Sequence, residues 1–203
     1  MVPHNLVSSQ AQTGVIAILA AGNARRMRGG DKCLETIGGV PLLRVLAQRA
    51  VGTGWPVSVT LPPDAHARSE AIAGLSISVM EVPDADDGMS ASFRALASAA
   101  MPLMIMLADM PEIETSDLAA LIAAYDGSCP VRATAEDGTL GQPVLFPPAD
   151  VTRMRNLSGD TGARALLRDQ AVRLVALPGR RAITDLDTPE AWSDWRTRTG
   201  ISR

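Results

Sequence analysis

Basic side chains and glycines lie close together in residues 19–32, which read LAAGNARRMRGGDK. Arg26 and Lys32 lie in this stretch with two further arginines. Free backbone N–H groups beside such cations suit an anion that carries several charges, for example a triphosphate. The common phosphate-loop patterns are absent, because no Gly-x-Gly-x-x-Gly occurs and Asp31 separates Gly30 from Lys32. The stretch therefore predicts phosphate binding by a less common kind of loop.

Carboxylates that could bind a metal ion occur in two segments far along the chain from this loop. Asp109 follows an apolar run, residues 103–107, and Asp185 and Asp187 precede a helix start at Thr188-Pro189. A triphosphate held by cations usually also needs Mg²⁺, which one or two carboxylates bind together with phosphate oxygens. The competing interpretations are a turn or capping role for Asp109 and an N-cap at Asp187 or Thr188. A cap uses one oxygen and a metal another, so Asp187 can serve both roles.

Two further segments combine glycine with polar side chains. They are Gly141-Gln142-Pro143 and residues 158–162, which include Asp160. Taken alone, both have ordinary turn compositions and predict little chemistry. Cys33, next to Lys32, has no partner histidine nearby in the sequence, so we interpret it as a small packing residue rather than an activated thiol.

Alternating strands and helices would position these residues. Residues 15–18 form an apolar run typical of a strand buried on both faces, and residues 40–51 have helical spacing. The same alternation continues, with strands predicted at 57–61, 77–82, 103–107, 143–147 and 172–177 and helices at 65–73, 86–100, 115–125, 163–169 and from Pro189 onward. The regular order predicts an α/β fold with a mainly parallel sheet covered on both sides.

The predicted sheet places the candidate residues at one edge. Ligands of open α/β sheets bind beyond the carboxyl ends of the strands, and adjacent parallel strands would bring Asp109 near the basic loop. Residues 143–147 are bracketed by prolines, which predicts a strand at or near an edge of the sheet.

Length and charge limit the classes of function. The 203 residues are enough for one sizeable core, which predicts a single domain over 15–203 after a flexible tail, residues 1–14. A net charge of −3 gives no general attraction to nucleic acid or to an anionic membrane, so the basic loop indicates a small anionic ligand. The chain has neither a secretory signal nor a membrane-spanning run, and two cysteines form no disulfide framework, which predicts a cytoplasmic protein.

The motifs taken together resemble a known family. They are Leu19-Ala-Ala-Gly22, Arg26-Met27, Asp31-Lys32, Gly39-x-Pro41-Leu42-Leu43, Met89-Ser90-Ala91-Ser92, Leu107-Ala-Asp109-Met-Pro111, Gly141-Gln-Pro-Val144 and Asp187-Thr-Pro189. Most of them occur in this order in MobA-like nucleotidyltransferases, over roughly residues 15 to 195. Within that group the chain most resembles the molybdenum cofactor cytidylyltransferases, because it has Leu-Ala-Ala-Gly, Ala-Asp-Met-Pro and the Met-Ser-Ala-Ser helix start.

The resemblance implies a three-layer α/β/α fold of the nucleotide-diphospho-sugar-transferase type. It also implies transfer of CMP from CTP, favoured over GTP, to molybdopterin with release of pyrophosphate, and a molybdoenzyme as recipient of the product. The implied sites are Leu19, Ala20, Ala21, Gly22, Arg26, Lys32, Ser90 and Ser92 for the nucleotide, with Arg26 and Lys32 catalytic, Asp109 and Asp187 (or Asp185) for Mg²⁺, and Gly141, Gln142 and Asp160 for the acceptor.

One departure from the resemblance concerns the acceptor. Many cytidylyltransferases of the group have Gly-His-Pro where this chain has Gly141-Gln142-Pro143, a form more familiar from the guanylyl branch. Guanylyl transfer, transfer to another phosphorylated acceptor, and a non-catalytic carrier that inserts molybdenum cofactor therefore stay as alternatives. A glycosyltransferase using Asp185-Leu-Asp187 is less favoured, since such a motif normally lies mid-chain, and a Rossmann oxidoreductase lacks its glycine fingerprint here.

Overall fold

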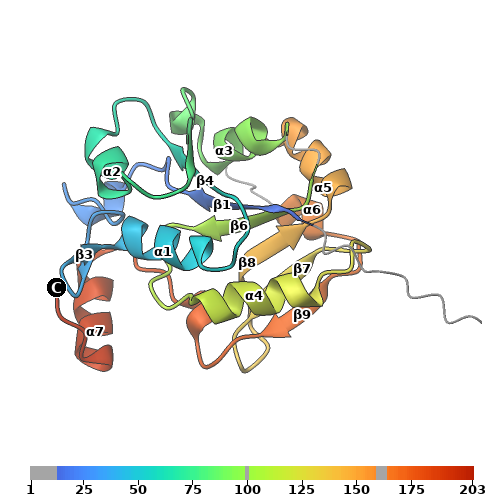
Figure 1. The fold of residues 1–203 in the computed structure, drawn as a ribbon. Helices are drawn as coiled ribbons and strands as arrows, with labels where there is room; N and C mark the ends of the chain where they lie inside the picture. Colours follow the sequence, from blue (N-terminus) through green and yellow to red (C-terminus); the bar gives the residue numbers. More distant parts are fainter. Residues whose placement is uncertain (1–12, 99–100, 159–163) are drawn as a thin grey trace, which may run out of the picture.

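A single seven-stranded sheet forms the centre of the molecule, as the computed structural model in Figure 1 shows. The structure describes residues 13–98, 101–158 and 164–203. The strand order is β5-β4-β1-β6-β8-β7-β9. The strands are β1 (Val15–Leu19), β4 (Val57–Leu61), β5 (Ser78–Glu81), β6 (Leu103–Leu107), β7 (Val131–Thr134), β8 (Leu140–Phe146) and β9 (Arg173–Ala176).

Most neighbouring strands run parallel. β1 pairs in parallel with β4 and β6, and β4 with β5. β8 is antiparallel to both of its neighbours, and β9 is parallel to β7. β1, with a strand hydrogen-bonded on each side, therefore lies inside the sheet, and the segment that leaves its carboxyl end lies beside the ends of β4 and β6. A separate two-stranded sheet consists of β2 (Thr36–Ile37) and β3 (Val40–Pro41).

Helices cover both faces of the sheet, because successive strand residues point to opposite faces. On one face, Ile16, Ile18 and Met104 pack in a core with α1 (Leu42–Val51), α4 (Thr115–Ala124) and α7 (Pro189–Thr199). On the other face, Ala17 and Ile105 pack with α3 (Met89–Leu96), α5 (Pro148–Arg153) and α6 (Arg164–Leu167). The remaining helix, α2 (His66–Ala71), contacts α1. The predicted α/β fold with three layers and a mainly parallel sheet is confirmed.

The structure corrects the predicted position of one strand. Residues 143–147 were expected at or near an edge, but β8 lies inside the sheet between β6 and β7. Pro143 has no N–H to donate to a neighbouring strand. The pairing of β8 with β6 stops at Val144, just after this proline, and the pairing of β8 with β7 is irregular between Arg132 and Thr134. An irregularity of this kind lets a proline sit in an interior strand.

Several element boundaries also differ from the prediction. The helix expected from Val40 begins at Leu42, because Val40 and Pro41 pair with Thr36 and Ile37. Strand β7 and helix α5 were not predicted. The expected tail, residues 1–14, lies outside the described residues except for Thr13 and Gly14, so the tail and the single domain after it stay predictions.

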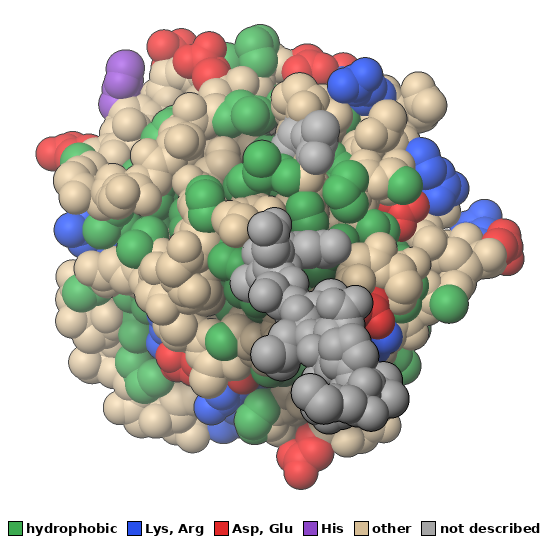
Figure 2. Space-filling view, turned by 45° about the vertical axis from the view of Figure 1, so that its right-hand side comes forward, with side chains coloured by type: hydrophobic (Ala, Val, Ile, Leu, Met, Phe, Trp, Pro, Cys, Tyr) green, Lys and Arg blue, Asp and Glu red, His purple; other side chains and the backbone are tan. Residues whose placement is uncertain are grey.

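The surface carries dispersed charge on the face that Figure 2 shows, where acidic and basic side chains are interspersed around the outline. None of the helices in the described ranges combines the length and the apolar character that crossing a bilayer requires.

Candidate active site

A cavity of about 620 Å³ opens at the carboxyl ends of β1 and β6. Residues from the loop after β1, the start of α3 and the segment after β6 surround it. Its lining includes Leu19, Ala20, Ala21, Gly22, Arg26, Lys32, Cys33, Met89, Ser92, Asp109 and Asp187. The fold thus brings together the basic loop and the two carboxylates that the sequence places 77 and 155 residues away from Lys32.

Lys32 bridges the two carboxylates inside this cavity. Its Nζ lies 2.6 Å from Asp109 Oδ2 and 2.7 Å from Asp187 Oδ1. Arg26 pairs with the other oxygen of Asp187, with 2.6 Å between Nη2 and Oδ2. Two cations and two carboxylates therefore alternate in one connected cluster, and each of them is in position to exchange its present partner for a charged ligand.

Burial and charge shift the pKa values of this cluster. Burial raises the pKa of the Asp109 carboxyl, and the neighbouring Lys32 ammonium works in the opposite direction. Burial also disfavours the charged form of Lys32, but the charges and hydrogen bonds of Asp109 and Asp187 outweigh it and raise the pKa of the ammonium. Lys32 is therefore a fixed positive charge at neutral pH.

The carboxylates fit the requirements of a divalent cation. Asp109 Oδ1 is buried and has no hydrogen-bond partner within the described residues, so one acceptor oxygen next to Asp187 is unused. The described part of the chain contains no cluster of three or more histidine, cysteine or acidic side chains suited to hold a metal. A cation at Asp109 and Asp187 would take its other ligands from phosphate and water, as Mg²⁺ usually does.

Asp187 is free for this role because its neighbour caps the helix. Thr188 is the N-cap of α7, and its side-chain oxygen accepts the backbone N–H of Ala191 at 3.2 Å. Asp185 lines a second cavity, and its negative charge contributes to the raised pKa of the Asp109 carboxyl. The backbone N–H of Leu186, between the two aspartates, donates to the carbonyl oxygen of Asp109 at 2.9 Å. This bond ties the Asp187 segment to the end of β6.

Arg68 of α2 supports the basic loop, residues 19–32, a role that the sequence does not predict. Its Nη1 donates to the carbonyl oxygens of Ala20 at 2.6 Å and Gly22 at 3.1 Å, and its Nε donates to Asp31 Oδ2 at 2.6 Å. Asp31 also accepts the backbone N–H of Cys33 through Oδ1. With these carbonyls engaged by a buried guanidinium, the loop backbone before Lys32 is fixed.

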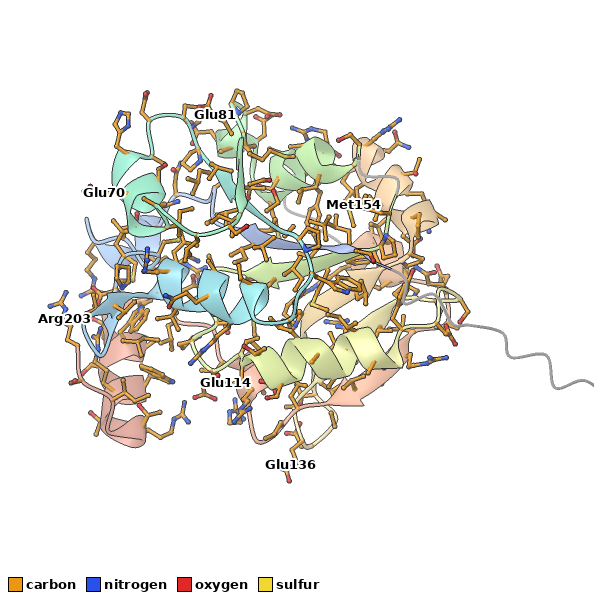
Figure 3. The ribbon with its side chains drawn as sticks, in the orientation of Figure 1. Glu70, Glu81, Glu114, Glu136, Met154 and Arg203 are labelled. Atoms are coloured by element: carbon orange, nitrogen blue, oxygen red, sulfur yellow. The ribbon has the colours of Figure 1, made fainter. Side chains whose placement is uncertain are left out.

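Arg49 of α1 supports the Asp109 side in a similar way. Its Nη1 donates to the carbonyl oxygens of Pro111 and Ile113, both at 2.8 Å, and its Nη2 lies 2.8 Å from Glu114 Oε1. Figure 3 shows Glu114 at the start of α4, where this segment ends. No local motif marks Arg49 or Arg68, because their partners, backbone carbonyls and one carboxylate each, are distant in the sequence.

The other predicted residues divide into three groups. Ser92 lines the cavity, whereas Ser90 is fully buried and its Oγ accepts a hydrogen bond from Arg94 at 3.2 Å. Gly141 and Gln142 line the second cavity. Asp160 lies outside the described residues. Burial raises the pKa of the Cys33 thiol to about 12, in keeping with a packing role.

Gly141 has a packing reason of its own. A Cβ at this position would lie 2.1 Å from the carbonyl oxygen of Ala182, so any larger residue would force backbone to move. The glycine is therefore required by the close approach of two chain segments, whatever it contacts in a complex.

Comparison with known proteins relates the fold and the site to a family. The chain is 27% identical over 194 residues to the purine catabolism protein PucB of Bacillus subtilis, covering 86% of this chain and 91% of PucB. The structure of Rv0371c from Mycobacterium tuberculosis in complex with manganese is 25% identical, with a TM-score of 0.74 over 90% of this chain and 97% of Rv0371c. A nucleotidyl transferase from Methanothermobacter shares the fold, with 19% identity, a TM-score of 0.76 and coverage of 92% and 97%.

A family model supplies the assignment. The model of the MobA-like NTP transferase domain matches residues 16–174, which include the basic loop and Asp109. The chain belongs to the family of MobA-like NTP transferase domains.

Proposed function

We propose that this nucleotidyltransferase moves CMP from CTP to the phosphate of molybdopterin and releases pyrophosphate. The observation that carries the proposal is the cluster in which Lys32 and Arg26 meet Asp109 and Asp187 beside the loop from Leu19 to Gly22. The choice of CTP and molybdopterin is supported by the sequence motifs that resemble cytidylyltransferases.

The reaction needs alignment and charge neutralisation more than proton transfer. The acceptor phosphate oxygen is already anionic near neutral pH, so its attack on the α-phosphorus requires no general base from the protein. The cavity lining contains no histidine among the described residues, which agrees with such a reaction. The backbone from Leu19 to Gly22, held by Arg68, would orient the triphosphate, and Lys32 and Arg26 would stabilise the negative charge that builds up on it.

A divalent cation, which we propose to be Mg²⁺, would be held by Asp109 and Asp187. When bound, it would neutralise phosphate charge and orient the pyrophosphate leaving group. The manganese complex of the similar Rv0371c supports a divalent cation in this family. Because the same carboxylates now pair with Lys32 and Arg26, their engagement by a cation would leave both basic side chains available to the phosphates.

A cytoplasmic location is part of the proposal. Nucleoside triphosphates are made there, and the cysteines Cys33 and Cys129 are both free thiols, as a reducing compartment favours.

A guanylyl transferase is the second candidate, and Gln142 favours it. Gln142 stands where many cytidylyltransferases of the group have histidine, and its Oε1 is buried without a hydrogen-bond partner among the described residues. A non-catalytic carrier is less well supported, since Arg26, Lys32, Asp109 and Asp187 are all present and meet in one cavity.

Pyrophosphate release tests the proposal. The protein would be incubated with Mg²⁺ and molybdopterin, and with CTP, GTP, ATP or UTP in separate reactions. We expect pyrophosphate with CTP at a rate well above that with the other nucleotides. Release with GTP alone would favour the guanylyl candidate, and no release with any nucleotide would contradict an enzyme acting on this acceptor.

A further inference from the structure

A second cavity, of about 510 Å³, lies beside the first. Met89 of α3 and Leu107 of β6 line both cavities, so the two share a boundary. Its apolar lining comes from both the sheet and the helices around it and includes Phe93, Ile105, Met110, Leu140 and Leu167. A molecule bound here would therefore bury an apolar part of its surface next to the first cavity.

Two arginines face this cavity. Arg132 lies on β7, and Arg164 lies at the start of α6. The Nε of Arg132 donates to the carbonyl oxygen of Gly141 at 2.9 Å, which fixes the plane of its guanidinium group. Neither arginine forms an ion pair with an acidic side chain of the described residues, and Asp185 is the one carboxylate in the lining.

The positive charges of Arg132 and Arg164 are close enough to interact. Burial lowers the pKa of the Arg132 guanidinium, and the positive charge of Arg164 lowers it further. Like charges that approach one another without an acidic partner are costly unless an anion joins them. The pair is thus suited to a phosphate or carboxylate, which a planar guanidinium can bind with two parallel hydrogen bonds.

Gln142 adds a neutral polar group to the same lining. Its Oε1 is buried and has no hydrogen-bond partner among the described residues, although a buried acceptor of this kind normally has one. The cavity lining therefore combines two cations with the polar side chain of Gln142, beside an apolar surface.

We propose that Arg132 and Arg164 bind the phosphate or carboxylate group of the acceptor substrate in this cavity. The inference rests on the proposed function, because it assigns the second cavity to the acceptor. With an uncharged acceptor, Asp185 would be the one acidic side chain of the described lining to offset the charges of the two guanidinium groups. Arg164 is exposed and forms no hydrogen bond or ion pair of its side chain within the described residues, so its substitution is the most specific test of this role.

Anion binding in the second cavity can be measured with the first cavity filled. Inorganic phosphate and, separately, malonate would be titrated by calorimetry into the protein saturated with Mg²⁺ and α,β-methylene-CTP. We expect binding of at least one anion, and phosphate without malonate would identify a phosphate group as the ligand. Because a hydrogen bond to a charged group is strong, Arg164→Gln is expected to weaken this binding by about tenfold or more.

Two comparisons separate this inference from the proposed function. Arg168→Gln, which removes an exposed arginine just after α6 that does not line the cavity, should leave anion binding unchanged. Anion binding by Arg164→Gln equal to wild type, or no binding of either anion by wild type, would overturn the inference. Failure of the CTP analogue to bind would instead count against the proposed function. In that case the arginines would still be tested by the same anion titrations with Lys32→Ala, which removes a cation from the first cavity.

Discussion

At the scale of single residues, Lys32 connects the two carboxylates of the candidate site. Its ammonium group is within hydrogen-bond distance of both carboxylates, and burial alone would disfavour its charge. The surrounding acids keep it protonated, so it is a positive charge whose position is fixed before a nucleotide arrives. Preorganised charge of this kind stabilises a transition state without a cost of reorganisation.

Lys32→Ala should lower turnover by about 100- to 1,000-fold, the usual loss when one donor to developing negative charge is removed. We expect a much smaller effect on the fold when Mg²⁺ is present to neutralise the carboxylates. Steady-state pyrophosphate release and thermal unfolding would be measured on the same preparation.

A matched control for this prediction is Arg28→Gln. Arg28 belongs to the same loop, but it is exposed, pairs with Glu190 and does not line the cavity. Its turnover should remain near wild type. Equal turnover for Lys32→Ala and Arg28→Gln would remove Lys32 from the catalytic assignment.

Cys33 should be unreactive although it follows Lys32 in the sequence. Its pKa, raised to about 12 by burial, lies far above pH 8, so the thiol stays neutral and the nucleophilic thiolate is scarce. With iodoacetamide at pH 8, mass spectrometry should find Cys129, which is less buried, modified first. Denatured protein should be modified at both cysteines. Equal rates at both cysteines in the native protein would contradict the burial of Cys33.

At the scale of elements, two arginines on separate helices hold the two sides of the site. Arg68 of α2 donates to carbonyls of the basic loop, and Arg49 of α1 donates to carbonyls of the segment after Asp109. The loop residues could be predicted because their types and spacing are local. These two supports could not, since each acts through backbone atoms that only the fold brings near.

Arg68→Met should weaken both nucleotide binding and stability. It removes a largely buried guanidinium from Asp31 and from two carbonyls, and breaking a buried pair typically costs about 3 to 5 kcal/mol, less here because Asp31 is partly exposed. The KM for the nucleotide should rise more than turnover falls. Steady-state kinetics and denaturant unfolding would measure the two effects.

Arg44→Met offers the comparison for Arg68. Arg44 also donates to two backbone carbonyls, those of Ala71 and Ala73, but it does not touch the basic loop. Some stability should be lost, whereas the KM for the nucleotide should be unchanged. A nucleotide KM in Arg68→Met equal to that of Arg44→Met would show that Arg68 supports only the fold.

Gly141→Ala should destabilise the protein for reasons of packing. Its new methyl group would lie 2.1 Å from the backbone of Ala182, and overpacking of this kind costs about 1 to 3 kcal/mol or more. Gly22→Ala should be tolerated by the fold, because no atom lies within 4 Å of the added carbon. Denaturant unfolding would compare the two variants. Equal stability for both would contradict the close contact at Gly141.

Element boundaries show why local patterns were not sufficient in the second half of the chain. Pro143 predicted an edge strand, and the irregular pairing that accommodates it inside the sheet has no sequence signal. Strand β7 is four residues long and contains Arg132, so it lacks a continuous apolar run. Strands β1, β4 and β6 agree with the prediction, because β1 and β6 are apolar runs of five residues and β4 alternates apolar residues with Ser58 and Thr60 before Pro62.

At the scale of the whole molecule, strand order explains how the site forms. β1 and β6 are neighbours although they are separated by α1, β4, α2, β5 and α3 in the chain. Their carboxyl ends lie together, and the hydrogen bond between Leu186 and Asp109 brings in the segment before α7. The position of Asp109 followed from a parallel sheet, whereas the contact of Asp187 with Lys32 depends on the path of the last 30 or so residues, which periodicity does not define.

The sheet also places two cavities side by side at its functional edge, one lined by the basic loop and one by Arg132 and Gln142. With the nucleotide in the first cavity and the acceptor in the second, as we propose, this arrangement suits a reaction between two bound substrates. The sequence predicts a site near the basic loop and Asp109, where the first cavity lies, whereas the second cavity could not be predicted, because its lining combines segments from both halves of the chain.

The most direct test of the central claim follows the α-phosphorus of the nucleotide. CTP labelled at this phosphorus would be incubated with the protein, Mg²⁺ and molybdopterin, and the products separated by chromatography. We predict that the label passes to molybdopterin while unlabelled pyrophosphate is released, and that neither occurs with Lys32→Ala at a comparable rate. Label that remains in CTP, or appears only in free CMP, would contradict nucleotidyl transfer to this acceptor.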